Sequence, residues 1–196
     1  MKYLKRFGLF GLAAMAVAAV SAPGSASATT LEITGSTQNQ SVEFAMSLES
    51  GSSVVFKTTS GTIQNTCTAS EMAGSTITPY TGTTVTAPLT TLSFGKCTGS
   101  VTVDKAGTLH FEHIKGTTDA KLISSGAEIT VWSVPMNQYL NLKTGSGVTI
   151  GIVTGVQHDH AKVHVNAVVS FSFLLPSGTW EGDYIVTTPT GFGISQ

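Results

Sequence analysis

The sequence predicts an all-β fold, and within that class a two-sheet antiparallel sandwich of immunoglobulin-like or jelly-roll-like form. Apolar and polar residues alternate with a period of two in many short runs after residue 29. Gly, Pro, Asn and Ser separate these runs, as turn residues do. No stretch of that region repeats apolar residues at i, i+3, i+4 and i+7 over three turns, so we expect little helix.

The longest alternating run covers residues 162–173 and predicts a half-buried strand. Apolar residues occupy every second position, and mostly polar residues such as His164 and Asn166 occupy the positions between them. Similar runs predict about ten to thirteen strands in all. They lie at 41–48, 54–58, 62–68, 90–94, 100–103, 108–114, 128–134, 139–142, 148–156 and 183–187.

The segment 70–88 is the least regular part of the chain. It is rich in Thr, Gly and Pro, and its alternation is poor. We therefore expect a long exposed loop there.

The first 28 residues have the three parts of a secretory signal peptide. Lys2, Lys5 and Arg6 form a basic start, an apolar run covers 7–20, and Ala26-Ser27-Ala28 is an A-x-A cleavage site. A membrane anchor is the alternative, but the apolar run is shorter than the roughly 20 residues that span a bilayer. The sequence predicts export, a single domain at 29–196, and a secreted or cell-envelope protein with no membrane span after cleavage.

The charge of the exported part argues against nucleic acid as a partner. Residues 29–196 contain seven Lys, no Arg and eleven acidic residues, a net charge of about −4 with His neutral. Without Arg the chain lacks the forked donor that suits phosphate and guanine edges, and its Lys residues are scattered.

The two cysteines of the chain are Cys67 and Cys97, both within the exported part. A cysteine pair in an oxidising compartment usually forms a disulfide, so we expect a Cys67–Cys97 bridge. A zinc site is the alternative, but two thiolates with no neighbouring His fall short of the four ligands that zinc prefers.

Three histidines, His158, His160 and His164, are the candidate metal ligands. His158 and His160 could share one face, and His164 could join them if the chain turns beyond Asp159. Three neutral imidazoles suit Zn or Cu, which would allow a metal-dependent enzyme. The competing interpretation of the three histidines is a polar hairpin tip whose side chains bind no ligand. We expect the protein to need no cofactor.

Other catalytic patterns are weak or missing in the sequence. It has neither a G-x-S-x-G elbow nor a phosphate-binding glycine loop. Glu181 and Asp183 lie beside Trp180, a combination that can mark sugar chemistry, but two carboxylates around Gly182 are more typical of a solvated turn. These observations favour a protein without catalytic activity.

Trp132 and Trp180 are the candidate residues for stacking on a sugar ring or on a partner surface, with Tyr139 and Tyr184 as further aromatic candidates. The alternation around Trp132 does not decide whether its side chain is buried, because Ile129 and Ser133 share one face while Thr130 and Val134 share the other. Packing in the core is the default interpretation of such aromatic residues.

One part of the chain resembles a known group of proteins. A series of short motifs lies between residues 56 and 108: Phe56-Lys57-Thr58-Thr59, Cys67-Thr68-Ala69-Ser70, Gly74, the run 88–94, Cys97-Thr98-Gly99, Val101-Thr102-Val103 and Gly107-Thr108. This series resembles exported actinobacterial β-rich proteins of unassigned function. The resemblance covers about a third of the exported part. It implies a secreted sandwich with a Cys67–Cys97 bridge and implies no catalytic residue.

A fainter similarity is to fimbrial subunits, through Phe94-Gly95-Lys96-Cys97 and the cysteine some thirty residues earlier. It would imply polymerisation by strand exchange. The N-terminal donor strand and terminal Tyr pattern of such subunits are not recognisable in this chain.

Together these features predict a secreted or cell-envelope protein that is not an enzyme and has a structural or surface-binding role. A carbohydrate-binding module, an adhesin or a fibre subunit are the alternatives. A cell-wall or surface glycan, a protein, or a second copy of the chain are the partners that such roles would require.

Overall fold

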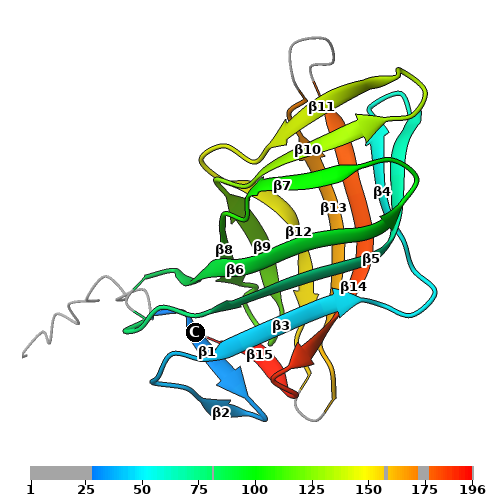
Figure 1. The fold of residues 1–196 in the computed structure, drawn as a ribbon. Coiled ribbons are helices and arrows are strands. Elements are labelled where there is room, and N and C mark those ends of the chain that lie inside the picture. The colour runs from blue at the N-terminus through cyan, green and yellow to red at the C-terminus, as the bar shows by residue number, and fades with distance from the viewer. Residues whose placement is uncertain (1–27, 81, 157–158, 172–176, 196) are drawn as a thin grey trace, which may run out of the picture.

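The computed structural model describes residues 28–80, 82–156, 159–171 and 177–195, and the chain in these ranges is built from β-strands (Figure 1). The all-β class is therefore confirmed. No helix of the described residues is long and apolar enough to cross a membrane. The predicted signal peptide lies outside these ranges, apart from Ala28.

The described strands are β1 (Thr30–Ile33), β2 (Ser36–Thr37), β3 (Glu43–Leu48), β4 (Val54–Thr58), β5 (Ile63–Ser75), β6 (Thr84–Cys97), β7 (Val101–Lys105), β8 (Thr108–His113), β9 (Ala120–Ser125), β10 (Glu128–Ser133), β11 (Gln138–Lys143), β12 (Val148–Thr154), β13 (Lys162–Val169), β14 (Gly178–Thr188) and β15 (Phe192–Ser195).

The largest sheet closes on itself. Within the described residues it has nine antiparallel strands in the order β13-β12-β9-β8-β6-β5-β3-β14-β4, and β14 pairs back with β13 so that Val163 lies opposite Tyr184. Strand β4 pairs with both β5 and β14, as β3 does, so β3 and β4 occupy one strand position in succession. The result is a barrel with eight strand positions.

This closure differs from the two-sheet sandwich that the sequence predicts. Antiparallel pairing and period-two alternation are present as expected, but alternation shows only that each strand has one buried face. Strands of a sandwich and of a closed barrel share that property. The pairing of β13 with β14 decides between them, and this contact is invisible in the pattern of either strand.

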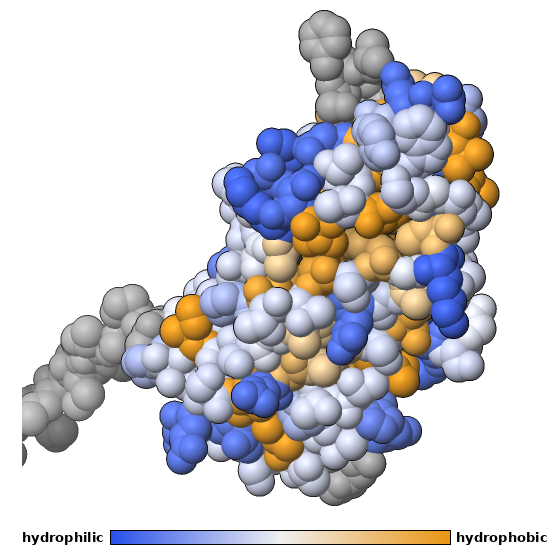
Figure 2. Space-filling view, in the orientation of Figure 1, coloured by the Kyte–Doolittle hydropathy of each residue, from blue (hydrophilic) through white to orange (hydrophobic). Residues whose placement is uncertain are grey.

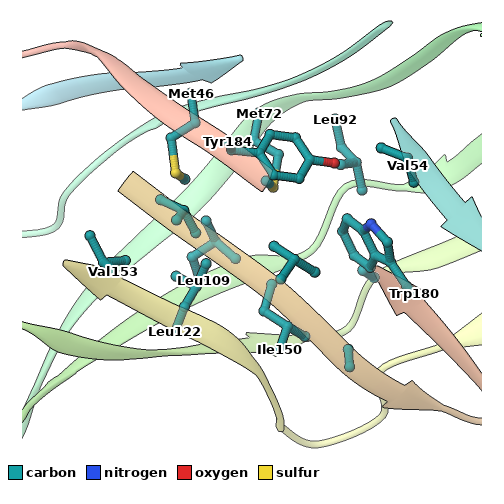
Figure 3. Close-up of a cluster of buried hydrophobic side chains, with 14 of the residues drawn as sticks. Met46, Val54, Met72, Leu92, Leu109, Leu122, Ile150, Val153, Trp180 and Tyr184 are labelled. Carbon is teal, nitrogen blue, oxygen red and sulfur yellow. The ribbon is translucent and has the colours of Figure 1, made fainter. Parts of the chain in front are cut away.

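Side chains fill the interior of the barrel. Figure 3 labels buried residues from every strand of the closed sheet except β13: Met46, Val54, Met72, Leu92, Leu109, Leu122, Ile150, Val153, Trp180 and Tyr184. Strand β13 follows the predicted alternation, with Val163, Val165, Ala167 and Val169 buried and the residues between them exposed. The barrel is therefore a packed core rather than a container for a ligand.

A smaller three-stranded sheet lies at each end of the barrel. The order β15-β1-β2 forms one of them, and Leu31, Phe192 and Ile194 in it belong to the buried core. The order β11-β10-β7 forms the other and lies across the opposite end (Figure 1). Its inward residues, including Ile129, Val131 and Leu140, are also buried.

The loop expected at 70–88 is much shorter in the structure. Strand β5 continues to Ser75 and β6 begins at Thr84, so that prediction was wrong for most of the segment. A register shift at Gly74 accommodates the irregular sequence, and Leu89 lies opposite Gly74 there. A Cβ atom at Gly74 would overlap the carbonyl oxygen of Pro88, so the two strands approach closely because that residue is glycine.

Cys67 and Cys97 form the predicted disulfide. The two residues lie opposite each other in the β5–β6 pair, and Cys67 is fully buried. The bridge therefore joins the strands at the point where β6 leaves the closed sheet and continues toward β7.

We expect reduction of this disulfide to destabilise the fold. The bridge spans 30 residues of sequence. Closing a loop of that size removes unfolded-state entropy equivalent to about 3–4 kcal/mol in the chain-entropy model. Urea unfolding of oxidised and reduced protein measures the difference, and the Cys67→Ser/Cys97→Ser double variant is the control, since a reductant should not affect it. An unchanged unfolding midpoint on reduction would contradict this expectation.

Tyr184 gives a second prediction, on alkaline stability. Its buried hydroxyl donates a hydrogen bond to Ser70 Oγ at 3.0 Å. Burial raises the pKa of Tyr184 from 10.0 to about 12, so between these pH values the unfolded chain loses a proton that the folded chain keeps. The contribution of protonated Tyr184 to the free energy of unfolding is fully present below pH 10. It falls by up to about 3 kcal/mol as the pH rises to 12. Denaturant unfolding between pH 10 and 12 should show that the free energy of unfolding falls more steeply with pH in the unmodified protein than in Tyr184→Phe. Identical pH profiles would show that Tyr184 is not the group responsible.

Candidate functional site

The outer face of the β7–β10–β11 sheet carries a group of exposed aromatic and hydrogen-bonding side chains. In β10 the alternation is strict, with Ile129, Val131 and Ser133 buried beneath the sheet. Thr130 and Trp132 therefore point outward. The sequence could not assign this face because the residues beside Trp132 have misleading polarity: Ser133 is buried and Val134 is exposed.

Trp132 and Tyr139 form an aromatic pair on this face, called here the aromatic row. They lie opposite each other in the β10–β11 register. Their ring centroids are 4.8 Å apart and their planes meet at 69°, an edge-to-face arrangement. Tyr139 is 61% exposed, the largest exposed fraction among the large apolar and aromatic residues in the part of the chain described. An aromatic surface is thus presented to solvent in a fixed geometry.

The backbone around Trp132 is held from two sides. Its amide donates to the carbonyl oxygen of Ser100 at 2.8 Å, and its carbonyl oxygen accepts from Asn65 Nδ2 at 2.9 Å. The indole packs against Gly99, where an added Cβ would lie only 2.7 Å from Trp132 Cδ1. Buried Gln64 strengthens the attachment by accepting a hydrogen bond from Ser133 Oγ at 2.6 Å. Strand β5 therefore anchors the end of the β10–β11 hairpin that carries the aromatic pair.

Next to the aromatic row lies a polar row made of Thr102, Thr130 and Asn141, which are aligned across the three strands. Thr130 Oγ1 donates to Asp104 Oδ2 at 2.7 Å and accepts from Asn141 Nδ2 at 3.4 Å. Asn141 Oδ1 is buried and has no hydrogen-bond partner among the described atoms. Together with Asp104 beside it, the row offers hydroxyl, amide N–H and carboxylate groups that can bond to hydroxyls of a ligand.

A charged row at the far end consists of Lys105, Glu128 and Lys143. The carboxylate of Glu128 accepts from Lys105 Nζ at 2.7 Å and from Lys143 Nζ at 3.2 Å. The hydrogen bond from Lys105, followed by that from Lys143, lowers the pKa of Glu128, and the bond to Glu128 raises the pKa of Lys105. With Asp104 beside it, this end of the face has equal numbers of positive and negative groups.

Exposed apolar residues lie at the opposite end, beyond the aromatic row. Val134 and Met136 are in the β10–β11 turn, and Ile63 at the start of β5 is next to Gln64, whose carbonyl oxygen accepts from the Val134 amide. We call Ile63, Val134 and Met136 the apolar tip. In Figure 2, hydrophilic residues gather at the left end of the upper sheet and hydrophobic residues appear at its right-hand edge.

The predicted histidine site is only partly described. His158 lies outside the described residues. The Nδ1 atom of His160 is 2.7 Å from the carbonyl oxygen of Val186, whereas that of His164 is 2.7 Å from Asp183 Oδ1. In the described part of the chain, no group of three His, Cys, Asp or Glu side chains could hold a metal ion. A site completed by His158, and the metal-dependent enzyme it would allow, stay predictions.

Trp180 lies in the core. It is 2% exposed, so the prediction that it stacks on a ligand was wrong, and its ring packs edge-to-face on Phe94 with centroids 5.7 Å apart. Glu181 and Asp183 project to the outer face of β14, where Glu181 pairs with Lys57 and Asp183 with His164. The two carboxylates therefore have separate partners on the outer face of the sheet.

Sequence reasoning found Trp132 and Tyr139 but missed Gly99, Asp104 and Asn141. The available signal was the alternation of β11, in which Tyr139, Asn141 and Lys143 share one face. The position of Asp104 had no comparable signal, because it lies at a register shift between β7 and β10.

Comparison with protein-family models, with curated proteins and with solved structures finds no match for this chain. The resemblances to exported actinobacterial proteins and to fimbrial subunits therefore stay predictions.

The two tryptophans should differ in their effect on stability. Trp180→Ala removes a fully buried ring and should lower the free energy of unfolding by about 3–5 kcal/mol. Trp132→Ala removes a half-buried ring at the surface and should cost about 1 kcal/mol. Urea unfolding of both variants measures this difference, and an equal or larger loss for Trp132→Ala would show that Trp132 is mainly a core residue.

Proposed function

We propose that this protein is an exported, non-enzymatic protein that binds carbohydrate on the outer face of the β7–β10–β11 sheet. The observation that carries the proposal is the aromatic row: half-buried Trp132 and exposed Tyr139 form an aromatic pair on the outer face, beside a row of hydrogen-bonding side chains. Its location, secreted or in the cell envelope, rests on the predicted signal peptide. The Cys67–Cys97 bridge is in keeping with an oxidising compartment.

A sugar ring has an apolar face of C–H groups and a rim of hydroxyls. An exposed aromatic pair offers the apolar contact, and the neighbouring Asp104, Thr130 and Asn141 offer acceptors and donors for the hydroxyls. A carboxylate acceptor is particularly effective, because hydrogen bonds to a charged group are stronger than those between neutral groups. The same face has few features that would favour a phosphate or a nucleic acid, since its two lysines share Glu128.

The proposal of a binding protein rather than an enzyme rests on how the ionisable groups are used. Glu181, Asp183 and His164 on the barrel wall pair with individual neighbours. His110 lies between Thr86 Oγ1 and Ser125 Oγ, at 3.2 and 3.0 Å, on an outward sheet face. Neither arrangement joins a nucleophile, a base and an orienting carboxylate in the described residues.

The test is a glycan-binding screen, followed by titration calorimetry on the glycans that bind. Trp132→Ala should weaken binding about tenfold or more, because the apolar contact of the sugar ring is lost. Tyr139→Ala should weaken it as well, whereas Tyr139→Phe keeps the ring and should bind nearly as the unmodified protein does.

Gly99→Ala offers a subtler variant, since its added methyl would push against the Trp132 indole without removing it. We expect weaker binding with the fold preserved. Each variant is checked by its unfolding midpoint, and Ile152→Ser, at an exposed site on β12, is the matched surface control. Absence of glycan binding, or equal binding by Trp132→Ala, would refute the proposed function.

A further inference from the structure

The outer face of the β7–β10–β11 sheet changes steadily in polarity along the strands. The apolar tip comes first, then the aromatic row, the polar row and the charged row. From Trp132 to Glu128 the face extends over four residues of β10, about 13 Å at the rise of an extended strand. The apolar tip adds the length of the β10–β11 turn. A single sugar ring would cover only a part of this surface.

Exposure at the apolar tip is not explained by the proposed carbohydrate contact. Val134 is 52% exposed, Met136 in the same turn is 37% exposed, and Ile63, next to the residue that bonds the Val134 amide, is 53% exposed. A free sugar offers hydroxyls on most sides and would leave these side chains in water. Apolar residues that gather next to a binding surface instead indicate that the ligand has an apolar part.

Charge complementarity narrows the ligand further. The residues 58–66 and 129–142, which form the tip and the two middle rows on β10 and β11, contain no charged side chain. At the other end, Lys105 and Lys143 are balanced by Glu128 and Asp104, and Glu128 accepts from both lysines. A polar head with no net charge therefore suits this face better than a phosphate or a uronic acid.

The order of the rows also matches the order of groups in one class of amphiphile. In a neutral glycolipid the acyl chains are followed by a glycerol or similar linker and then by the sugar head. Aromatic side chains such as Trp and Tyr suit the boundary between apolar and hydrated regions, because one part of the ring system is apolar and another is polar. Trp132 and Tyr139 lie at this boundary on the protein, between the apolar tip and the hydrogen-bonding rows.

From these observations we infer that the ligand is a neutral glycolipid, with its sugar head on the aromatic and polar rows and its lipid part on the apolar tip. The inference rests on the proposed carbohydrate binding and specifies its ligand class. Ile63, Val134 and Met136 are then specificity-determining residues, which select a lipid-linked glycan over the same glycan in free form.

The experiment compares lipid-linked and free forms of the same sugar heads. The probes are phosphatidylcholine vesicles that contain digalactosyl or diglucosyl diacylglycerol, phosphatidylcholine vesicles without glycolipid, and the two deacylated glycosyl glycerols in solution. We expect one of the glycolipid vesicles to bind about tenfold or more tightly than its own deacylated head, because two or more exposed apolar side chains become buried.

Variants separate the two parts of the ligand. Val134→Ser/Met136→Ser should reduce vesicle binding to the level of the deacylated head and leave binding of that head unchanged. The matched control is Val168→Ser/Ile152→Ser, which changes two exposed apolar residues on the barrel wall and should leave vesicle binding unchanged; Val168 is 60% exposed. Trp132→Ala should weaken binding of both the vesicle and the deacylated head.

Three binding results would overturn the inference: equal affinity for a glycolipid vesicle and its deacylated head, equal binding to vesicles with and without glycolipid, or no binding to either glycolipid. A fourth contrary result is a dimer that buries the apolar tip and that Val134→Ser/Met136→Ser dissociates. If glycans from the screen still bind in a Trp132-dependent manner, only the glycolipid inference fails. If no glycan binds, the proposed function itself fails.

Discussion

Pairing of β13 with β14 is the constraint on which the rest of the structure depends. It runs from Lys162 opposite Ile185 to Val169 opposite Gly178 and closes the sheet. In a closed antiparallel sheet the strands use their backbone hydrogen bonds on both sides, so no long edge is left open for pairing with another chain. Closure also creates an interior of fixed size, and the protein fills it with side chains such as Trp180, Tyr184 and Met72. The barrel therefore supports the smaller sheets at its ends, and the candidate site lies on the outer face of one of them.

The β7–β10–β11 sheet carries the candidate site, and its position is fixed by contacts with β5 and β6. The disulfide fixes the end of β6 to β5, and the chain reaches β7 within a few residues of Cys97. Buried Gln64 and Asn65 on β5 then hold the backbone of the β10–β11 hairpin through Ser133 and Trp132. Two of the few buried polar side chains of the described core are thus used to position the aromatic row. Such anchoring reduces the entropy that an aromatic side chain loses when it binds a ligand.

Individual strands could be predicted from the sequence much better than their arrangement. The alternation at 162–169 assigned the buried and exposed residues of β13 correctly, and the presence of two cysteines in a chain with a predicted signal peptide led to the correct prediction of the disulfide. Barrel closure could not be predicted, because pairing between distant strands leaves no trace in the period of either strand. The loop expected at 70–88 failed for a local reason: Gly74 and Pro88, normally strand breakers, meet at a register shift that tolerates both.

Prediction of the candidate site failed where polarity and burial disagree. Trp132 and Trp180 are chemically alike, and the sequence offered both for stacking, yet one lies on an outer face and the other in the core. Buried Ser133 donates a hydrogen bond to Gln64 Oε1 and accepts one from the Met136 amide. It shares the buried face of β10 with Ile129 and Val131, so Trp132 lies on the outer face. The acceptor of the Ser133 hydroxyl, Gln64, is 69 residues away in the sequence, so the residues next to Ser133 do not reveal that its side chain is buried. The residues of the candidate site therefore follow from the alternation of β10 and β11 once the buried face of β10 is known.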